Sequence, residues 1–112
     1  MRTIRGEIVF PSNAPKRLAR LVTIELHDIS LADAPSKMVA ETRLKDVQVR
    51  PDEDLPFTIK APEEESRGAA FRVHVDWDGD GHVSAGDLLT TQVNYVPGAG
   101  QAGLVQVPVT LI

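Results

Sequence analysis

Short stretches in which apolar and polar residues alternate recur along the chain, and this pattern constrains the fold more than any other feature. In the stretch 18–27, Val22, Ile24 and Leu26 alternate with polar residues. A period of two residues is typical of a β-strand with one buried face. Stretches that alternate in this way or are rich in β-branched residues lie at 3–10, 38–49, 55–60, 71–75, 88–95 and 104–112. The stretch 38–49 also contains residues that suit a helix, but its valines favour a strand.

Turn-forming residues separate these stretches, and no long helical pattern occurs between them. Turns at 11–15, 50–54 and 97–100 are rich in proline, glycine, serine or acidic residues, which end strands for steric and hydrogen-bonding reasons. The acidic run 63–65 is interpreted as solvated surface. The sequence therefore predicts an all-β fold: one antiparallel β-sandwich domain spanning residues 1–112, with about seven to eight short strands. Pro108 predicts that the last strand lies at a sheet edge or is bulged.

The stretch 76–87 reads D-W-D-G-D-G-H-V-S-A-G-D and has the residue spacing of an EF-hand calcium loop. Alternate aspartates in a tightly wound loop can turn their carboxylates toward one ion, and Gly81 suits the sharp turn that this requires. Oxygen ligands favour Ca²⁺, and less strongly Mg²⁺, over zinc. The predicted metal ligands are Asp76, Asp78, Asp80, His82 through its backbone carbonyl, Ser84 and Asp87.

Two features distinguish this loop from an ordinary EF-hand. Its last position holds Asp87, which is shorter than the usual glutamate, so moderate affinity is expected. Strands rather than helices are predicted on both sides, so the loop would stabilise a fold rather than move two helices. The competing interpretation is an Asp-Gly hairpin turn that binds nothing.

Charge and composition exclude several classes of protein. The formal net charge is −4, and the 12 Lys and Arg residues are scattered, which argues against a nucleic-acid surface. The chain has no cysteine, so it has no disulfide, thiolate nucleophile or cysteine zinc site. Its first residues have no apolar export signal and no stretch is long enough to span a membrane, which predicts a soluble, cytoplasmic chain if the start is genuine.

The segment Asp28-Ile29-Ser30-Leu31-Ala32-Asp33-Ala34-Pro35, between the strand at 22–26 and Leu55-Pro56-Phe57-Thr58-Ile59, resembles the YbaY/YscW family. That family groups envelope lipoproteins with pilotin-like chaperones that escort type III secretion secretins. The resemblance covers roughly residues 4–96. It implies a β-sandwich without enzymatic activity, placed in the periplasm or at the outer membrane and often held there by a lipidated cysteine. This chain lacks that cysteine.

Three functions are compatible with these features. The first is a non-catalytic, calcium-stabilised domain that binds an envelope protein at a sheet edge or through its loops. The second is a metal-dependent hydrolase that uses the Asp76–Asp87 cluster as a catalytic cation site, with no further catalytic residues assigned. The third is a structural domain whose loop binds nothing. His74 shares a strand face with Asp76 and is interpreted as a surface histidine rather than a general base.

Overall fold

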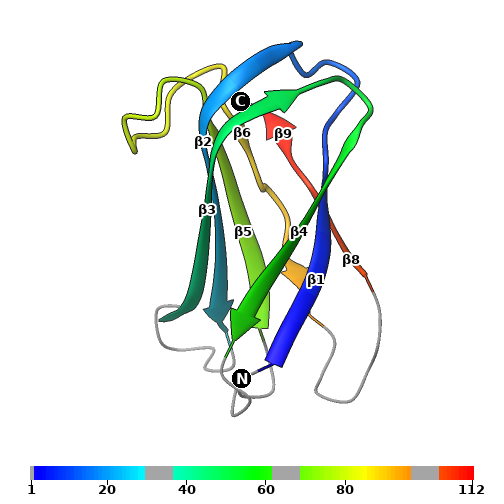
Figure 1. The fold of residues 1–112 in the computed structure, drawn as a ribbon, viewed down its shortest axis with the longest axis vertical. Helices are drawn as coiled ribbons and strands as arrows, with labels where there is room; N and C mark the ends of the chain where they lie inside the picture. Colours follow the sequence, from blue (N-terminus) through cyan, green and yellow to red (C-terminus); the bar gives the residue numbers. More distant parts are fainter. Residues whose placement is uncertain (1, 30–36, 62–68, 97–103) are drawn as a thin grey trace.

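The computed structural model describes residues 2–29, 37–61, 69–96 and 104–112. These residues form nine β-strands and no helix, which confirms the all-β prediction (Figure 1). The strands are β1 (Arg2–Val9), β2 (Arg17–Asp28), β3 (Lys37–Val49), β4 (Asp54–Ala61), β5 (Ala69–Asp76), β6 (Leu88–Leu89), β7 (Asn94–Tyr95), β8 (Val105–Pro108) and β9 (Thr110–Leu111). No described segment is a helix of the length and apolarity that a membrane crossing requires.

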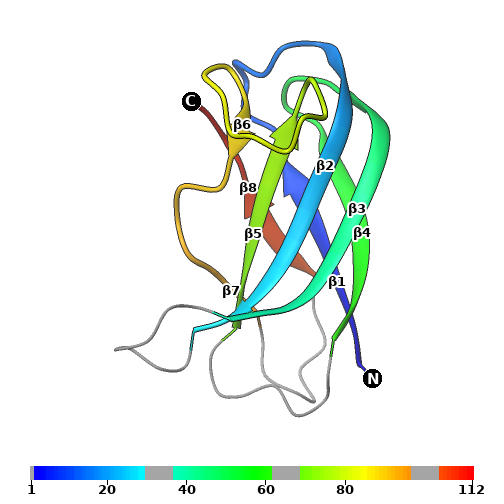
Figure 2. The same cartoon turned by 90° about the vertical axis from the view of Figure 1, so that its left-hand side faces the viewer.

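Two sheets pack face to face, as predicted for a β-sandwich. The smaller sheet has the strand order β4-β1-β8, and the larger has the order β3-β2-β5-β6-β9, with β7 also paired to β5. All strand pairs among the described residues are antiparallel except β1 with β8, which run parallel. The two views of the molecule show β1, β4 and β8 forming a layer across β2, β3 and β5 (Figures 1 and 2).

The core lies between the sheets and follows the alternation in the sequence. Val22, Ile24 and Leu26 of β2 are fully buried, while the residues between them are more exposed. Phe57 of β4 meets Phe71 of β5 edge to face, with ring centroids 5.2 Å apart. Because β4 and β5 belong to different sheets, this aromatic pair joins the two layers.

Gly6 makes room for Phe57. The two residues are directly opposed in the β1–β4 pair, and a Cβ atom at Gly6 would lie 2.5 Å from Cζ of Phe57. The carbonyl oxygen of Val105 would also lie 3.0 Å from that Cβ. Only glycine therefore fits beneath the ring without displacing a neighbour.

The strand count differs from the prediction because two predicted strands are each divided. The stretch 88–95 forms β6 and β7, and the stretch 104–112 forms β8 and β9. Pro108 ends β8, and after Val109 the chain passes from the edge of the small sheet to the edge of the large one. The prediction that Pro108 lies in an edge strand is confirmed.

Some predicted features lie outside the described residues. They are most of the family-like segment, the acidic run 63–65 and the turn 97–100.

Candidate functional site

The 76–87 loop connects β5 to β6 at the end of the sandwich where the C-terminus also lies (Figures 1 and 2). Gly79 and Gly81 have φ angles of 72° and 80°. These left-handed conformations are accessible to glycine at little cost, and they produce the sharp turn predicted at Gly81. The sequence therefore identified both the position and the backbone requirement of the loop.

Asp76 organises the first half of the loop. It is the last residue of β5, and only 1% of its surface is exposed. Its Oδ1 accepts the backbone N–H of Gly79 at 3.0 Å, and its Oδ2 accepts that of Gly81 at 2.8 Å. Hydrogen bonds to an ionised acceptor are stronger than neutral ones, so this carboxylate fixes the curvature of the loop.

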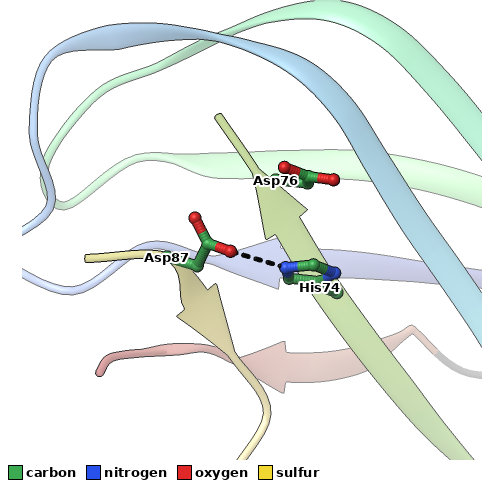
Figure 3. A group of neighbouring side chains, drawn as sticks. All are labelled: His74, Asp76 and Asp87. Carbon is green, nitrogen blue, oxygen red and sulfur yellow. Dashed lines mark hydrogen bonds and ion pairs between the residues drawn. The ribbon is translucent and has the colours of Figure 1, made fainter. Parts of the chain in front are cut away.

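Asp87 and His74 connect the second half of the loop to the sheet. Oδ2 of Asp87 accepts the backbone N–H of Ser84 at 3.0 Å and lies 2.8 Å from Nε2 of His74. Figure 3 shows Asp87 reaching from the start of β6 to the His74 ring on β5. The His74 side chain is only 15% exposed. His74, predicted to be a surface histidine near the acidic loop, is therefore half-buried and paired with Asp87.

Among the histidine and acidic side chains of the loop region, the structure brings together Asp76 and Asp87, which were predicted ligands, with His74, which was not. Ligand atoms of Asp76, Asp87 and His74 all lie within 4.8 Å of one another. The other four predicted residues, Asp78, Asp80, His82 and Ser84, lie on the exposed part of the loop. His74 could have been found from the sequence, because its spacing of two residues from Asp76 on one strand puts both on the same face.

The exposed aspartates make local contacts. Oδ1 of Asp80 accepts the backbone N–H of His82 at 2.9 Å. Oδ1 of Asp78 lies 3.8 Å from the Arg17 guanidinium, and both of these side chains are largely exposed. Exposed pairs of this kind contribute little to stability, so these carboxylates can reorient toward an ion at low cost.

The buried carboxylates have the chemistry that a hard cation requires. A carboxylate can accept about four hydrogen bonds or metal contacts, and each oxygen of Asp76 accepts one described N–H. Oδ1 of Asp87 has no hydrogen-bond partner among the described residues, although only 4% of this residue is exposed. A buried acceptor without a donor, close to a second buried carboxylate, fits a site that a cation would complete.

Trp77 and the C-terminal residue Ile112 hold the two ends of the loop in place. The Trp77 indole N–H donates to the carbonyl of Gly86 at 2.7 Å, which joins the second loop position to the eleventh. Gly86 donates its N–H to the carbonyl of Ile112 at 2.7 Å, and Ile112 donates to the carbonyl of Asp87 at 3.0 Å. The loop is therefore anchored at its base, while its tip is exposed.

A groove of about 510 Å³ lies beside the loop, on the outer face of the large sheet. The loop contributes Gly79, Asp80, Gly81 and Val83 to its wall, and His74 contributes from β5. Its remaining lining combines leucine, threonine, arginine and glutamate side chains of β2, β3, β5 and β6. This mixture of both charges and apolar groups does not define one ligand.

Comparisons with known proteins support the fold. No protein-family model matches the chain, and no curated protein matches it in sequence. The structure is similar to that of an alternative pilotin from the type II secretion system of Vibrio cholerae, with a TM-score of 0.64. The match covers 97% of this chain and 96% of the pilotin, at 20% sequence identity. The chain therefore has the same β-sandwich fold as that pilotin over almost its entire length.

Proposed function

We propose that this protein is a non-catalytic, pilotin-like domain that binds a protein component of a secretion system in the cell envelope. The observation that carries the proposal is the fold likeness to a secretion-system pilotin, which extends over 97% of this chain. The resemblance of the segment 28–35 to a family that contains pilotin-like chaperones agrees with this proposal, although no protein-family model matches the chain. Because the pilotin-like members of that family escort secretins, secretins are the first candidate partners.

A binding function agrees with the described geometry better than hydrolysis does. The Asp76 and Asp87 carboxylates are both buried, and Asp76 accepts two N–H groups of its own loop. A hydrolytic metal site needs an open coordination position that water and substrate can reach. Burial of these two carboxylates leaves a substrate little access to an ion held between them.

The proposed partnership is tested by co-expressing the chain with secretins from the same genome and measuring co-elution by size-exclusion chromatography. We expect a stable complex with at least one secretin, and no complex with an unrelated β-sandwich domain of similar size used in place of this chain. Failure to co-elute with any secretin or other secretion-system component would remove the proposed function.

We further propose that the 76–87 loop binds one Ca²⁺ ion. Asp76 and Asp87 would supply buried oxygen ligands, and His74 would orient Asp87 by donating its Nε2–H. Asp78, Asp80, Ser84 and the His82 carbonyl would complete the shell from the exposed side of the loop. The role proposed for the ion is to stabilise the connection between β5 and β6.

Terbium luminescence provides a direct test, because Tb³⁺ substitutes for Ca²⁺ and Trp77 is the only tryptophan. Its indole spans the base of the loop, so excitation of Trp77 should sensitise emission from a bound ion. We expect saturable emission that Ca²⁺ competes away and that Asp78→Ala combined with Asp80→Ala abolishes. The matched control Asp52→Ala with Asp54→Ala removes the same charge from two positions outside the loop and should leave the emission unchanged. Equal loss of emission in both double variants would indicate non-specific attraction and contradict the site.

A further inference from the structure

We propose that the outer edge of β3 is the partner-binding site, and that its ligand is an extended segment that adds to the large sheet as a further strand. This inference rests on the proposed binding function and specifies its mode. A sheet edge presents a row of N–H and C=O groups, and the partner whose own backbone complements such a row is another strand.

Among the described strands, β3 presents the edge best suited to this pairing. It spans Lys37–Val49 and pairs on one side with β2, while its other side has no strand partner among the described residues. The edge strands of the small sheet, β4 and β8, each contain a proline. The edge strand β9 has only two residues. Proline removes a donor from an edge and a very short strand offers few bonds, so these edges are protected and β3 is not.

Hydrogen bonds elsewhere in the sheet determine which β3 amides face outward. Val73 of β5 donates its N–H to the Thr90 hydroxyl and accepts the Thr90 N–H at its C=O. Both backbone groups of Val73 therefore point away from β2. The N–H and C=O groups of successive residues point to opposite sides of a strand, so those of His74 point toward β2. They are therefore expected to bond to the opposed Thr23. The neighbouring residues on β2 are Val22 and Ile24, and their N–H and C=O groups must then point toward β3.

This alternation continues across β2 to β3. Val22 and Ile24 are opposed to Leu44 and Thr42, whose N–H groups therefore bond to β2. The N–H and C=O groups of the alternate residues Glu41, Arg43 and Lys45 consequently point away from the sheet. The β2–β3 register is regular from Ala40 to Lys45; Asp46 has a φ angle of 54°, and an irregularity lies at Leu26/His27. The usable edge is therefore Ala40–Lys45.

The inward face of this edge is only partly covered. Ala40, Thr42 and Leu44 are half-buried, although the residues opposed to them on β2 are completely buried. The small sheet has three strands on its main path and the large sheet has five, so the small sheet leaves β3 incompletely covered at the margin of the sandwich (Figure 1). An added strand with apolar side chains on its inward face would bury these residues further.

The outward face determines the charge of the partner segment. Glu41 and Arg43 neutralise each other, with Arg43 Nε 2.9 Å from Glu41 Oε1. Lys45 is exposed beside them and has no ion pair among the described residues. The segment that fits this edge is apolar on its inward face and places a carboxylate opposite Lys45.

The experiment compares Arg43→Pro with Arg43→Ala. Both variants remove the Arg43 side chain, but only proline removes the outward N–H. Because that N–H does not bond to β2, proline at this edge position leaves the hydrogen bonds between β2 and β3 in place. The probe is a synthetic peptide of about ten residues that alternates valine with threonine and carries one central glutamate. Binding is measured by NMR titration, with amide hydrogen exchange recorded for β3.

In the free protein we expect fast exchange at Glu41, Arg43 and Lys45 and slow exchange at Thr42 and Leu44. The peptide should slow the three fast amides. Arg43→Pro should weaken peptide binding about tenfold or more, because the complex loses one backbone hydrogen bond. Arg43→Ala should retain binding within about twofold, because its backbone is unchanged.

If Arg43→Pro proves unstable, Glu41→Pro removes the neighbouring outward N–H and is used in its place. Equal peptide affinity in the alanine and proline variants, no binding by the wild type, or protection away from β3 would overturn the proposal. If a secretin co-elutes equally with the wild type and the proline variant, the edge proposal fails and the proposed function stands. If no secretin-type partner binds the wild type, the proposed function fails, and the peptide experiment still decides whether the edge accepts a strand.

Discussion

Replacing Asp76 with alanine is expected to lower the free energy of unfolding by about 3 kcal/mol in calcium-free buffer, measured by urea unfolding. The carboxylate is buried and accepts the backbone N–H groups of Gly79 and Gly81. Each hydrogen bond to a charged group contributes about 1.5 to 3 kcal/mol, and water reaching the exposed glycines offsets part of the loss. Asp76→Ala therefore tests whether this side chain organises the loop without an ion.

Asp78→Ala is the matched control, because it removes the same functional group from an exposed position two residues away. Without calcium, Asp78→Ala should lower the free energy of unfolding by no more than about 0.5 kcal/mol. Adding Ca²⁺ at about 100 times its dissociation constant should stabilise the wild type by about 2.7 kcal/mol and leave Asp76→Ala unchanged. Equal costs for the two variants in calcium-free buffer would show that Asp76 does not organise the loop. A calcium response retained by Asp76→Ala would contradict its proposed role as a ligand.

Gly6→Ala is expected to lower the free energy of unfolding by about 2 to 3 kcal/mol, although alanine usually stabilises a folded chain relative to glycine. The new Cβ would lie 2.5 Å from Cζ of Phe57 and 3.0 Å from the Val105 carbonyl oxygen. The Phe57 ring cannot move away freely because it packs against Phe71 in the core. Chemical denaturation with an unchanged m-value would measure this cost.

A double-mutant cycle isolates the cause of the Gly6→Ala effect. Leucine at position 57 lacks the Cζ and Cε1 atoms that the new methyl group would approach, so Phe57→Leu should relieve part of the clash. Gly6→Ala with Phe57→Leu should cost about 1 kcal/mol less than the sum of the single variants. Additive costs would place the conflict at the Val105 backbone instead of the aromatic ring.

The fold could be predicted from the sequence where one strand face is buried and the other is exposed. The inner row of β2 and the alternation in β5 fixed which side chains form the core. The period of two does not specify which sheet a strand joins, so the division of residues 104–112 between both sheets was not predicted. The division of 88–95 has a local cause: the Thr90 hydroxyl accepts the Val73 N–H, so a side chain replaces the next backbone bond of the ladder.

The candidate site could be located from the sequence, but its interior could not be described. Spacing and glycine chemistry identified the loop and the turn at Gly81. The pairing of His74 with Asp87 depends on how the loop folds back over β5, which local pattern does not encode. Likewise, Asp78 and Asp80 follow the EF-hand spacing, yet their carboxylates do not join the group formed by Asp76, Asp87 and His74 in the described structure.

The parallel pairing of β1 with β8 has a consequence for how the molecule folds. Glu7 and Gln106, which are neighbours across this pair, are 99 positions apart in the chain. Contacts between such distant positions form slowly, because a long loop must close before they stabilise anything. While the polypeptide is being synthesised, the small sheet cannot be completed until residues 105–108 have emerged from the ribosome. We therefore expect nascent chains that stop before this point to be readily digested by proteases and available to chaperones.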